Sequence, residues 1–273
     1  MGKIKKGIIL LFPLIWGCII NETPCCPEPI DDEPPAPPRG LYSVTGDRKV
    51  YLYWLPNTEK DLAGYVVWKG FSYEGPYTEI ATLGPSKTSY IDYEVQNGIT
   101  YYYAISAFDT AGNESDLSPE YVFDTPRPDG QDAVWSYLLF PDYSGFDFSL
   151  QSVVSYLSPS CDFYYKYDTA NGVGYIIVPD TETWIQDMGY TESFDDIGYA
   201  PEYGWSQVGI LEAIKGHTYI FWTRDNHFAK IRILNLNEKL IFEWAYQIDE
   251  GNPELRVYPH EGSKSLKIKR EVR

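Results

Sequence analysis

The chain has 273 residues and a formal net charge of −17, and 44% of its residues are hydrophobic and 16% aromatic. This length and hydrophobic content suffice for two cores and exclude a disordered chain, while the charge excludes nucleic-acid binding, which needs a positive surface against the phosphates. Tyrosine supplies 25 of the aromatic residues and favours half-buried strands, because its ring packs while its hydroxyl stays in water.

The first 17 residues are typical of an export signal. Lysines at positions 3, 5 and 6 precede an apolar run over 7–17, which is shorter than the roughly 20 residues of a membrane-spanning helix. The run ends in Trp16-Gly17-Cys18, which resembles the lipobox of bacterial lipoproteins, although Trp16 replaces the usual small residue. The resemblance implies a lipid on Cys18, the membrane as a partner, and a place in the bacterial cell envelope. Ordinary signal cleavage at another bond is the alternative.

Residues 18–37 are predicted to form a linker. Prolines and acidic residues crowd the stretch 23–38, and this composition favours extended polyproline II segments over a packed core. About twenty residues at roughly 3.1 Å each would reach up to about 60 Å from the membrane. Cys25 and Cys26 lie in this stretch without a second CxxC or CxxH partner, so no zinc site is expected.

Residues 38–126 are predicted to form a first domain of seven short strands. The alternating segments that predict them are 40–45, 49–54, 64–69, 77–82, 89–93, 100–107 and 120–123. A period of two places Val50, Leu52 and Trp54 on one face of the second segment, and it aligns Tyr101 with Tyr103 in the sixth. These two faces are expected to meet as the core of a sandwich.

This first domain resembles the fibronectin type III family. The matching features run in chain order: a proline-led start at 37–41, Trp54, a third-strand motif at 61–68, and Asn97-Gly98 leading into Tyr101. Tyr101 stands where the family has its tyrosine corner. The resemblance implies an immunoglobulin-like β-sandwich used for adhesion, for spacing or for presenting a neighbouring domain, and it assigns no ligand.

The loop after the sixth segment is rich in polar and acidic residues. Asp109, Asn113, Glu114 and Asp116 could suggest calcium, but their spacing is not that of an EF-hand loop. Aspartate, asparagine and glycine are also the residues that a tight turn requires. A turn is therefore the expected role of this loop.

Residues 130–258 are predicted to form a second, mainly antiparallel β domain, followed by a basic tail at 259–273. A helix is considered only around 208–214. The clearest signal is 217–234, two alternating strands joined through a two-residue turn at Asp225-Asn226. Counting out from that turn pairs Trp222 with Ala229 and Ile220 with Ile231 on an inner face. On the outer face it places cations over rings, with Lys230 opposite Phe221 and Arg232 opposite Tyr219. The run 240–246 is expected to join the same sheet.

The second half also resembles the HmuY-like lipoproteins, a family that implies an all-β, envelope-anchored haem-binding protein. The matching stretches are 145–148, 162–165, 216–219, 223–233 and 244–247. No ligand residue aligns, so the candidates for haem or ligand contact are His217, His227, Met188 and Trp205. In the predicted hairpin the two histidines lie roughly 23 Å apart at about 3.3 Å per residue and cannot share one haem. A solvated histidine at a turn is the alternative for His227.

Catalytic signatures are missing from the sequence. It has no GxSxG, HExxH, P-loop or GxGxxG motif, and it has only three histidines. A glycosidase needs two carboxylates at a defined separation, and the acids available in the second half carry no spacing signature. These acids are Asp195, Asp196, Glu202 and Glu212. The chain is therefore not expected to be an enzyme, and no metal or catalytic residue is assigned. The lone Cys161 is expected to be a buried, inert thiol.

These observations predict an all-β, lipid-anchored envelope protein. Its fibronectin type III domain would act as a spacer, and residues 130–258 would form a non-catalytic recognition domain for a protein or a glycan. Trp184, Trp205 and Tyr203 could stack on sugar rings, with core packing as their alternative role. Two other functions stay open. One is haem binding, which would make haem the cofactor where none is otherwise expected, and the other is an accessory role in a glycan-degrading system.

Overall fold

The computed structural model describes residues 31–206 and 208–255. The chain divides into two compact units, Met1–Asp32 and Glu33–Arg273, and only Asp31 and Asp32 of the first are described. The described residues form seventeen strands and one short 3-10 helix, η1 (Pro141–Tyr143), with no α-helix among them, which confirms the predicted all-β fold. Within these residues no helix has the length and apolarity to cross a membrane. The predicted signal peptide, Cys18 and the basic tail lie outside the described residues.

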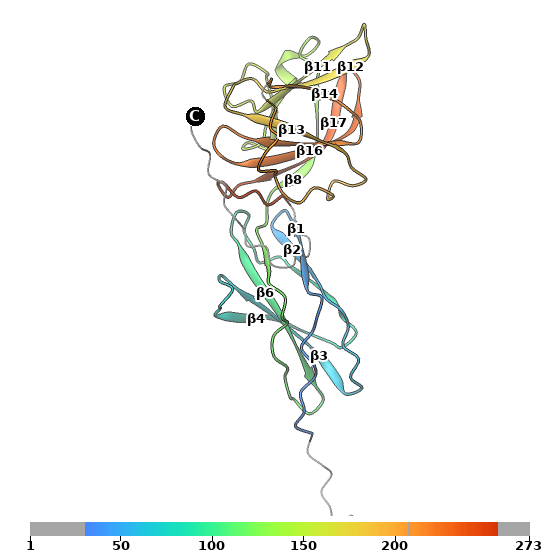
Figure 1. Ribbon diagram of the computed structural model, residues 1–273, viewed down its shortest axis with the longest axis vertical. Coiled ribbons are helices and arrows are strands. Elements are labelled where there is room, and N and C mark those ends of the chain that lie inside the picture. Colours follow the sequence, from blue (N-terminus) through green and yellow to red (C-terminus); the bar gives the residue numbers. More distant parts are fainter. Residues whose placement is uncertain (1–30, 207, 256–273) are drawn as a thin grey trace, which may run out of the picture. The chain divides into compact units, whose positions relative to one another are not determined.

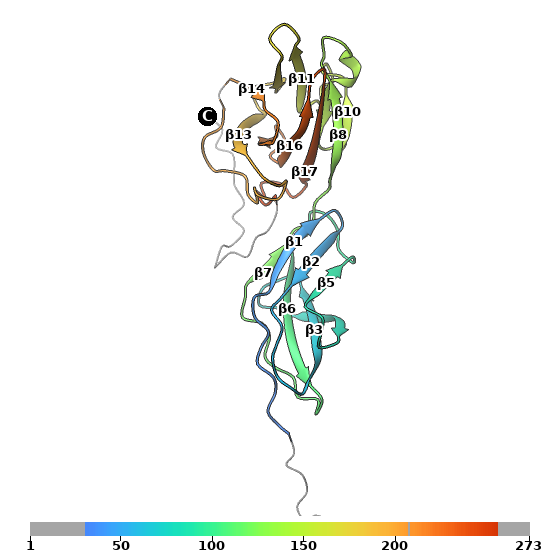
Figure 2. The same cartoon turned by 90° about the vertical axis from the view of Figure 1, so that its right-hand side faces the viewer.

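Seven strands build a first sandwich (Figures 1 and 2). They are β1 (Tyr42–Gly46), β2 (Lys49–Tyr53), β3 (Leu62–Gly70), β4 (Tyr77–Leu83), β5 (Ser89–Asp92), β6 (Tyr101–Asp109) and β7 (Val122–Asp124). They form two antiparallel sheets, ordered β1-β2-β5 and β4-β3-β6-β7. Each strand falls on one of the seven predicted segments, and all seven are confirmed.

The core of the first sandwich is the one that the strand period predicts. Val50, Leu52 and Trp54 from the β2 segment pack in one cluster with Tyr101 and the inward residues of β6. The Tyr101 hydroxyl accepts a hydrogen bond from the backbone N–H of Gln96 at 3.0 Å. This bond ties the start of β6 to the preceding loop, as the tyrosine-corner resemblance implies.

Ten strands build a second sandwich. They are β8 (Asp129–Trp135), β9 (Gly145–Asp147), β10 (Ser152–Val154), β11 (Phe163–Asp168), β12 (Val173–Ile177), β13 (Trp184–Tyr190), β14 (Ile210–Ala213), β15 (His217–Trp222), β16 (Phe228–Leu236) and β17 (Lys239–Gln247). One sheet has the order β10-β9-β11-β12-β14 and is called here the β11 sheet. The other has the order β13-β15-β16-β17-β8 and is called the β16 sheet.

The inner faces of these two sheets enclose a core rich in aromatic rings. Phe146 and Phe163 from the β11 sheet, and Phe148 directly after β9, meet Phe221 and Phe242 from the β16 sheet. Ring centroids in this group lie 5.2 to 6.0 Å apart. Edge-on and tilted contacts at this spacing are favourable for aromatic pairs. The predicted third strand at 240–246 is confirmed as β17, which pairs with β16.

The helix considered around 208–214 is wrong. Residues Ile210–Ala213 form β14, which pairs with β12 so that Ile177 lies opposite Ile210 and Gly174 opposite Ala213. Exposed Ile210 and Glu212 alternate with the less exposed Leu211 and Ala213. This period of two belongs to a strand, and so short a segment gains its order from a sheet edge rather than from helical propensity.

The predicted hairpin at 217–234 exists, but its predicted register is off by one residue. Trp222 pairs with Phe228 and Phe221 with Ala229, instead of Trp222 with Ala229. The cause is the loop, which spans residues 223–227 rather than two residues. Inside it the backbone N–H of Thr223 donates to His227 O at 2.9 Å and that of Asn226 to Thr223 O at 3.0 Å, and Asn226 takes a positive φ of 66°.

Because strand side chains alternate, a slip of one residue exchanges the two faces of one strand relative to the other. Tyr219 and Phe221, predicted to lie outside beneath cations, are fully buried in the core between the sheets. Ile220 and Trp222, predicted to face inward, lie on the opposite side of the β16 sheet. Lys230 lies over the ring of Phe194, 4.2 Å from its centroid, and not over Phe221.

The outer face of the β16 sheet is covered by the chain's own residues 191–206, called here the covering segment. Ala200 and Leu255 close a second buried cluster over Ile220, Trp222 and Phe228. The ammonium of Lys230, itself 0% exposed, donates to two carbonyl oxygens of this segment, Phe194 O at 2.7 Å and Ile197 O at 2.9 Å. The outer face of the β11 sheet has no such cover among the described residues.

Candidate functional site

The open outer face of the β11 sheet carries a row of aromatic and aliphatic side chains. Tyr164 on β11 lies opposite Ile177 on β12, which lies opposite Ile210 on β14. Tyr164 and Ile177 are half-buried, and Ile210 is 49% exposed. Their chain neighbours Phe163, Tyr165 and Ile176 point into the core, so strand alternation itself places this row on the outside.

Two further tyrosines extend the row beyond Tyr164. Tyr137 and Tyr156 lie with their ring centroids 5.5 and 5.4 Å from that of Tyr164, and 5.1 Å from each other. The backbone N–H of Tyr137 donates to Tyr165 O at 2.9 Å, and that of Tyr156 donates to Pro141 O at 3.2 Å. The three rings, called here the tyrosine cluster, are therefore held by one another and by the backbone before any ligand arrives.

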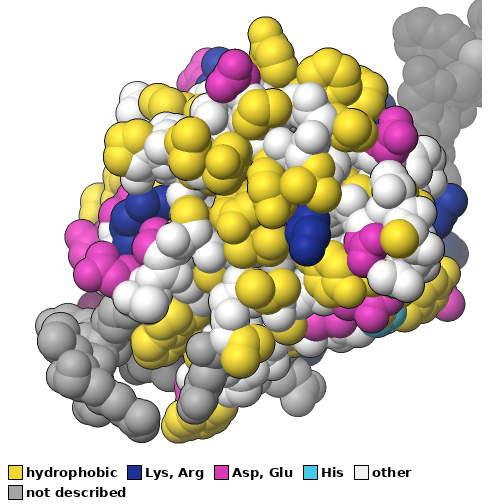
Figure 3. Space-filling model, turned by 90° about the horizontal axis from the view of Figure 1, so that it is seen from above, with side chains coloured by type: hydrophobic (Ala, Val, Ile, Leu, Met, Phe, Trp, Pro, Cys, Tyr) yellow, Lys and Arg dark blue, Asp and Glu magenta, His cyan; other side chains and the backbone are white. Residues whose placement is uncertain are grey.

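A second, polar row runs beside the first. Lys166 lies opposite Tyr175, which lies opposite Glu212, and the Lys166 ammonium stands 5.8 Å from the centroid of the Tyr175 ring. β11 and β12 lie at the upper end of the cartoon in Figure 1, and Figure 3 looks down on that end. It shows apolar side chains gathered around a basic side chain. The face therefore offers flat apolar surface with charged groups beside it.

Burial changes the ionisation of Tyr164, the central residue of the tyrosine cluster. Loss of solvent raises the pKa of the Tyr164 hydroxyl above its ordinary value, and the neighbouring Tyr137, Cys161 and Tyr156 add to this. The Tyr164 phenol therefore stays neutral at neutral pH, and it can both donate and accept a hydrogen bond. The three rings can hold a planar ligand by stacking and by hydroxyl contacts.

The two histidines proposed as ligand contacts lie at opposite ends of β15. His217 opens the strand, and its Nδ1 lies 3.0 Å from both carboxylate oxygens of Asp187. His227 lies in the loop beyond the other end, with Nδ1 3.4 Å from Asp225 Oδ2. The interaction with Asp225 raises the pKa of His227. With β15 between them, at about 3.3 Å per residue, they are roughly 20 Å apart, so one haem iron could not take both.

Met188 and Trp205, the other two predicted contacts, do lie together. Both pack against the buried cluster of Ile220, Trp222 and Phe228, as does Trp184. The Trp205 ring lies 6.4 Å from Trp184 and 5.7 Å from Trp222, so core packing accounts for these rings. Tyr203 differs, because 81% of it is exposed. Among the described residues, no hydrogen bond or ring contact joins Met188 or Trp205 to a histidine.

The four acids considered for glycosidase chemistry are spread over two elements. Asp196 belongs to a turn, where its carboxylate accepts the backbone N–H of Glu192 at 2.7 Å and of Ser193 at 3.0 Å. Asp195 and Glu202 lie in the same covering segment, and Glu212 lies on β14 across the sandwich. They supply no facing pair.

A closer carboxylate pair, which the sequence did not indicate, lies inside the second sandwich. Asp147 and Asp162 stand one residue beyond Phe146 and Phe163, which pair across β9 and β11. Asp162 is 6% exposed and Asp147 is 0% exposed. Burial raises the pKa of Asp162 to about 7, partly offset by the backbone N–H of Phe148, raised further by Asp147 and lowered by Arg224. A substrate cannot reach carboxylates this deeply buried, so the pair is structural.

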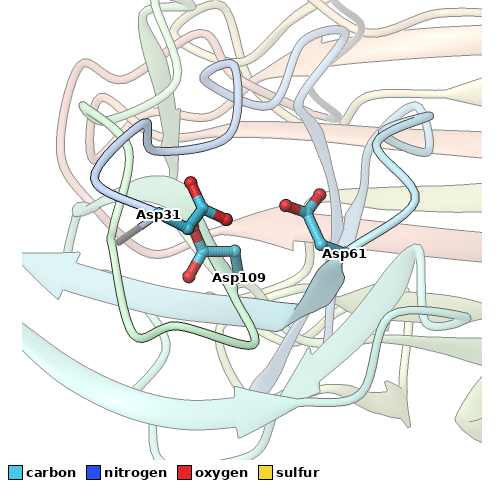
Figure 4. A group of neighbouring side chains, drawn as sticks. All are labelled: Asp31, Asp61 and Asp109. Atoms are coloured by element: carbon cyan, nitrogen blue, oxygen red, sulfur yellow. The ribbon is translucent and has the colours of Figure 1, made fainter. Parts of the chain in front are cut away.

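The acidic loop of the first sandwich is a turn, as expected. The Asp109 Oδ1 atom accepts three backbone N–H groups, those of Ala111, Gly112 and Asn113, at 2.7 to 2.9 Å. Its Oδ2 atom accepts the Asn113 side chain at 2.9 Å. Figure 4 shows this carboxylate at the end of β6, with Asp61 at the start of β3; the third labelled residue, Asp31, belongs to the N-terminal unit. The carboxylate of Asp109 therefore serves the loop.

Cys161 is buried, as predicted. Its thiol donates to Phe163 O at 3.1 Å, and burial raises its pKa to about 12, with Asp162 adding to the shift. A thiol in this state is neither a metal ligand nor a nucleophile at neutral pH.

Known proteins match only part of this chain in sequence. No family model matches the sequence. A segment of 69 residues, 24% of the chain, is 41% identical to an amylopullulanase of Thermoanaerobacter thermohydrosulfuricus, and a segment of 88 residues is 36% identical to an amylopullulanase of Thermoanaerobacterium thermosulfurigenes. The chain spans only 5% of the length of either relative.

Among solved structures, the chain is similar to an Fn3-like protein from Clostridium thermocellum, with 32% identity. The match covers 34% of this chain and 96% of that one, with a TM-score of 0.29. It is also similar to a β-1,2-glucanase from Parabacteroides distasonis, with 28% identity over 35% of this chain and 13% of that one, and a TM-score of 0.31. Fn3-like proteins are thus among its structural neighbours.

Proposed function

We propose that this chain is a lipid-anchored envelope protein whose second sandwich recognises a glycan without catalysis, with the fibronectin type III-like sandwich as its spacer. The observation that carries the proposal is the open row on the β11 sheet, where Tyr137, Tyr156 and Tyr164 stand side by side. Apolar surface of this kind on a folded protein marks a binding face. A sugar ring offers one face of C–H groups, which packs against an aromatic ring, and hydroxyls at its rim, which bond to phenols and charged groups.

The openness of the row favours a chain-like ligand. A pocket encloses most of a small ligand, whereas a sheet face leaves a polymer free to extend past both ends. The rings are held by mutual contacts 5.1 to 5.5 Å apart, so binding loses little side-chain entropy. Lys166, Tyr175 and Glu212 supply hydrogen-bonding groups beside the row.

The relatives support an accessory role. The matched segments come from amylopullulanases, enzymes named for their action on glucans, yet they make up 5 to 7% of those proteins. A segment so small is consistent with a non-catalytic module that accompanies catalysis elsewhere. We propose the same accessory role for the present chain, as one part of a glycan-degrading system.

The test is binding to pullulan and soluble starch, the polymers in the relatives' name, by affinity electrophoresis and calorimetry. Tyr164→Ala and Tyr137→Ala should each weaken binding tenfold or more, equivalent to about 1.4 kcal/mol. Tyr93→Ala is the matched control, since it removes an exposed tyrosine from the first sandwich and should leave binding unchanged. Equal binding by all three variants, or no binding of the intact chain to a wider panel of glycans, would refute the proposal.

The lipid anchor has its own test. Cys18→Ala should prevent incorporation of labelled palmitate and should move the protein out of the membrane fraction, because the lipid is the anchor that the sequence offers. Cys25→Ser is the matched control and should change neither. Unaltered labelling and fractionation of Cys18→Ala would remove the anchor from the proposal while leaving the glycan site untouched.

A further inference from the structure

Two carboxylates are buried where the first sandwich ends and the second begins. Asp124 closes β7 of the first sandwich and is 0% exposed, and Glu254 follows β17 of the second sandwich and is 1% exposed. Among the described residues no hydrogen bond of ordinary geometry reaches either oxygen of Asp124 or the Oε1 atom of Glu254, although the Thr45 and Ser43 hydroxyls lie near enough to Asp124 to favour its charged form. A buried carboxylate without partners is costly in its charged form.

The groups around Asp124 and Glu254 do not supply enough positive charge to balance two ionised carboxylates. Arg127 is the one cation whose charge acts on both carboxylates, and it is 1% exposed. Its guanidinium donates to Leu255 O and lies 3.5 Å from Asp129. The other ionisable groups that face the site are Tyr103 on β6 beside Asp124, and Asp129 and Asp195 beside Arg127. With both carboxylates ionised, the site would therefore hold excess negative charge away from water.

Neutral groups bind the two sandwiches together at the same place. The Thr125 hydroxyl donates to Glu254 Oε2 at 3.2 Å, and the Asn252 side chain donates to the Thr125 hydroxyl at 3.3 Å. The Gln247 amide donates to Glu254 O at 3.1 Å and, at 3.4 Å, to Thr125 O. Gly98 of the first sandwich packs against Ile248 of the second, and its N–H donates to Pro126 O at 2.8 Å.

We propose that Asp124 and Glu254 form a proton-dependent lock between the two sandwiches, closed while the pair keeps a proton and loosened when both carboxylates ionise. The burial of both groups explains why protonation should close the junction and ionisation should open it. A proton lets one carboxyl stay neutral in the dry site, whereas two charges repel each other and attract water. Opening the junction to solvent returns both groups to the ordinary carboxyl range, so ionisation favours opening.

The pKa values of both carboxyl groups are raised, as the proposed lock needs. Burial raises the pKa of Asp124, with the nearby Thr45 and Ser43 hydroxyls and Arg127 offsetting part of the shift. Burial, and then the charge of Asp124, raise the pKa of Glu254. Since the closed junction holds its proton more tightly than the open one, closure is favoured at low pH and is lost as the pH rises above the ordinary carboxyl range and through the raised one.

Hydrogen exchange of the whole chain between pH 5 and pH 8 tests the lock. After correction for intrinsic exchange, the opening equilibrium constant reported by amides of 96–99 and 251–255 should rise, by up to tenfold per pH unit for one proton released. Amides of β3 in the first core should show no such rise. Asp124→Asn and Glu254→Gln should each flatten the dependence, because a neutral amide replaces a carboxyl of the same shape.

Asp162→Asn is the matched control, since it removes a buried carboxyl with a raised pKa that has no contact at the junction. It should keep the rise at 96–99 and 251–255. A junction whose opening constant does not change with pH in the unaltered chain would overturn the proposal, as would a rise that persists in both Asp124→Asn and Glu254→Gln. If one of these variants fails to fold, the other still decides the question.

Discussion

The two outer faces of the second sandwich differ in whether the chain covers them. On the β16 sheet, the covering segment lies over Trp222 and Phe228 and accepts the ammonium of a fully buried lysine, Lys230. On the β11 sheet, a lysine of similar placement, Lys166, stays half-buried beside Tyr175. Among the described residues, no segment covers the β11 face. The covering segment thus lies over one face of the second sandwich, and tyrosines remain on the other face.

This difference separates aromatic rings that are buried by the chain itself from rings that stay open to contact. Rings under a loop contribute to stability in proportion to the apolar area that they bury, whereas rings on an open face contribute little to stability and remain available to a ligand. Tryptophan dominates the covered face and tyrosine the open one, which suits a residue whose hydroxyl must remain in water. Stability and binding should therefore respond to mutation on different faces.

The largest expected effect comes from a ring on the covered face. Trp222 is 4% exposed, and its indole N–H donates to Asn226 at 2.9 Å, so Trp222→Ala should lower the free energy of unfolding by about 3 to 5 kcal/mol. Tyr164→Ala on the open face should lower it by only about 1 kcal/mol, since that ring is half-buried. Urea unfolding measures both. Equal losses would mean that the two faces do not differ as described.

The two lysines give the next contrast. Lys230→Met keeps the length of the side chain but leaves the carbonyl oxygens of Phe194 and Ile197 without their donor, which should cost about 3 kcal/mol of stability. Lys166→Met on the open face should change stability by less than about 0.5 kcal/mol. Chemical unfolding at one pH, with the two variants side by side, distinguishes them. A small effect at Lys230 would indicate that the covering segment is held by its apolar contacts alone.

A pH-dependent effect is expected where the two sheets meet at Asp162. The Arg224 guanidinium, from the loop after β15, lies 3.4 Å from this carboxylate. Because the folded-state pKa is raised to about 7, the folded chain holds a proton that the unfolded chain releases near pH 4, so stability should fall as the pH rises from about 4 to 7. Asp162→Asn should remove a fall of about 3 to 4 kcal/mol. Thermal unfolding across that range measures it, and an unchanged slope would contradict the assignment.

The smallest effect is kinetic and concerns Cys161. Because burial raises its pKa to about 12, the thiol should not react with a thiol reagent at pH 8 in the folded protein, and should react fully in denaturant. Peptide mass spectrometry separates it from Cys25 and Cys26. Rapid labelling of Cys161 in the folded state would show that the end of the core near β9 opens readily.

Local pattern determined much of the first sandwich. The alternation in Val50, Leu52 and Trp54 depends only on the pleat of a strand, and the turn at 109–113 depends on one aspartate that bonds to the backbone N–H groups just after it. Such features follow from neighbours in the chain, and each was predictable. The tyrosine cluster was not, because Tyr137, Tyr156 and Tyr164 come from three separate segments that only the sheet brings together.

The second sandwich shows the same distinction between features set by neighbours in the chain and features set by distant contacts. The sequence determined that 217–234 is a hairpin, since alternation and a turn are local properties. The register was decided by a five-residue loop, whose internal bonds outweighed the two-residue turn, and one residue of slip exchanged the faces of β15. The burial of Lys230 and the bond of Thr125 to Glu254 arise from contacts between distant segments. No period in the sequence records such contacts, because their energy depends on packing in three dimensions.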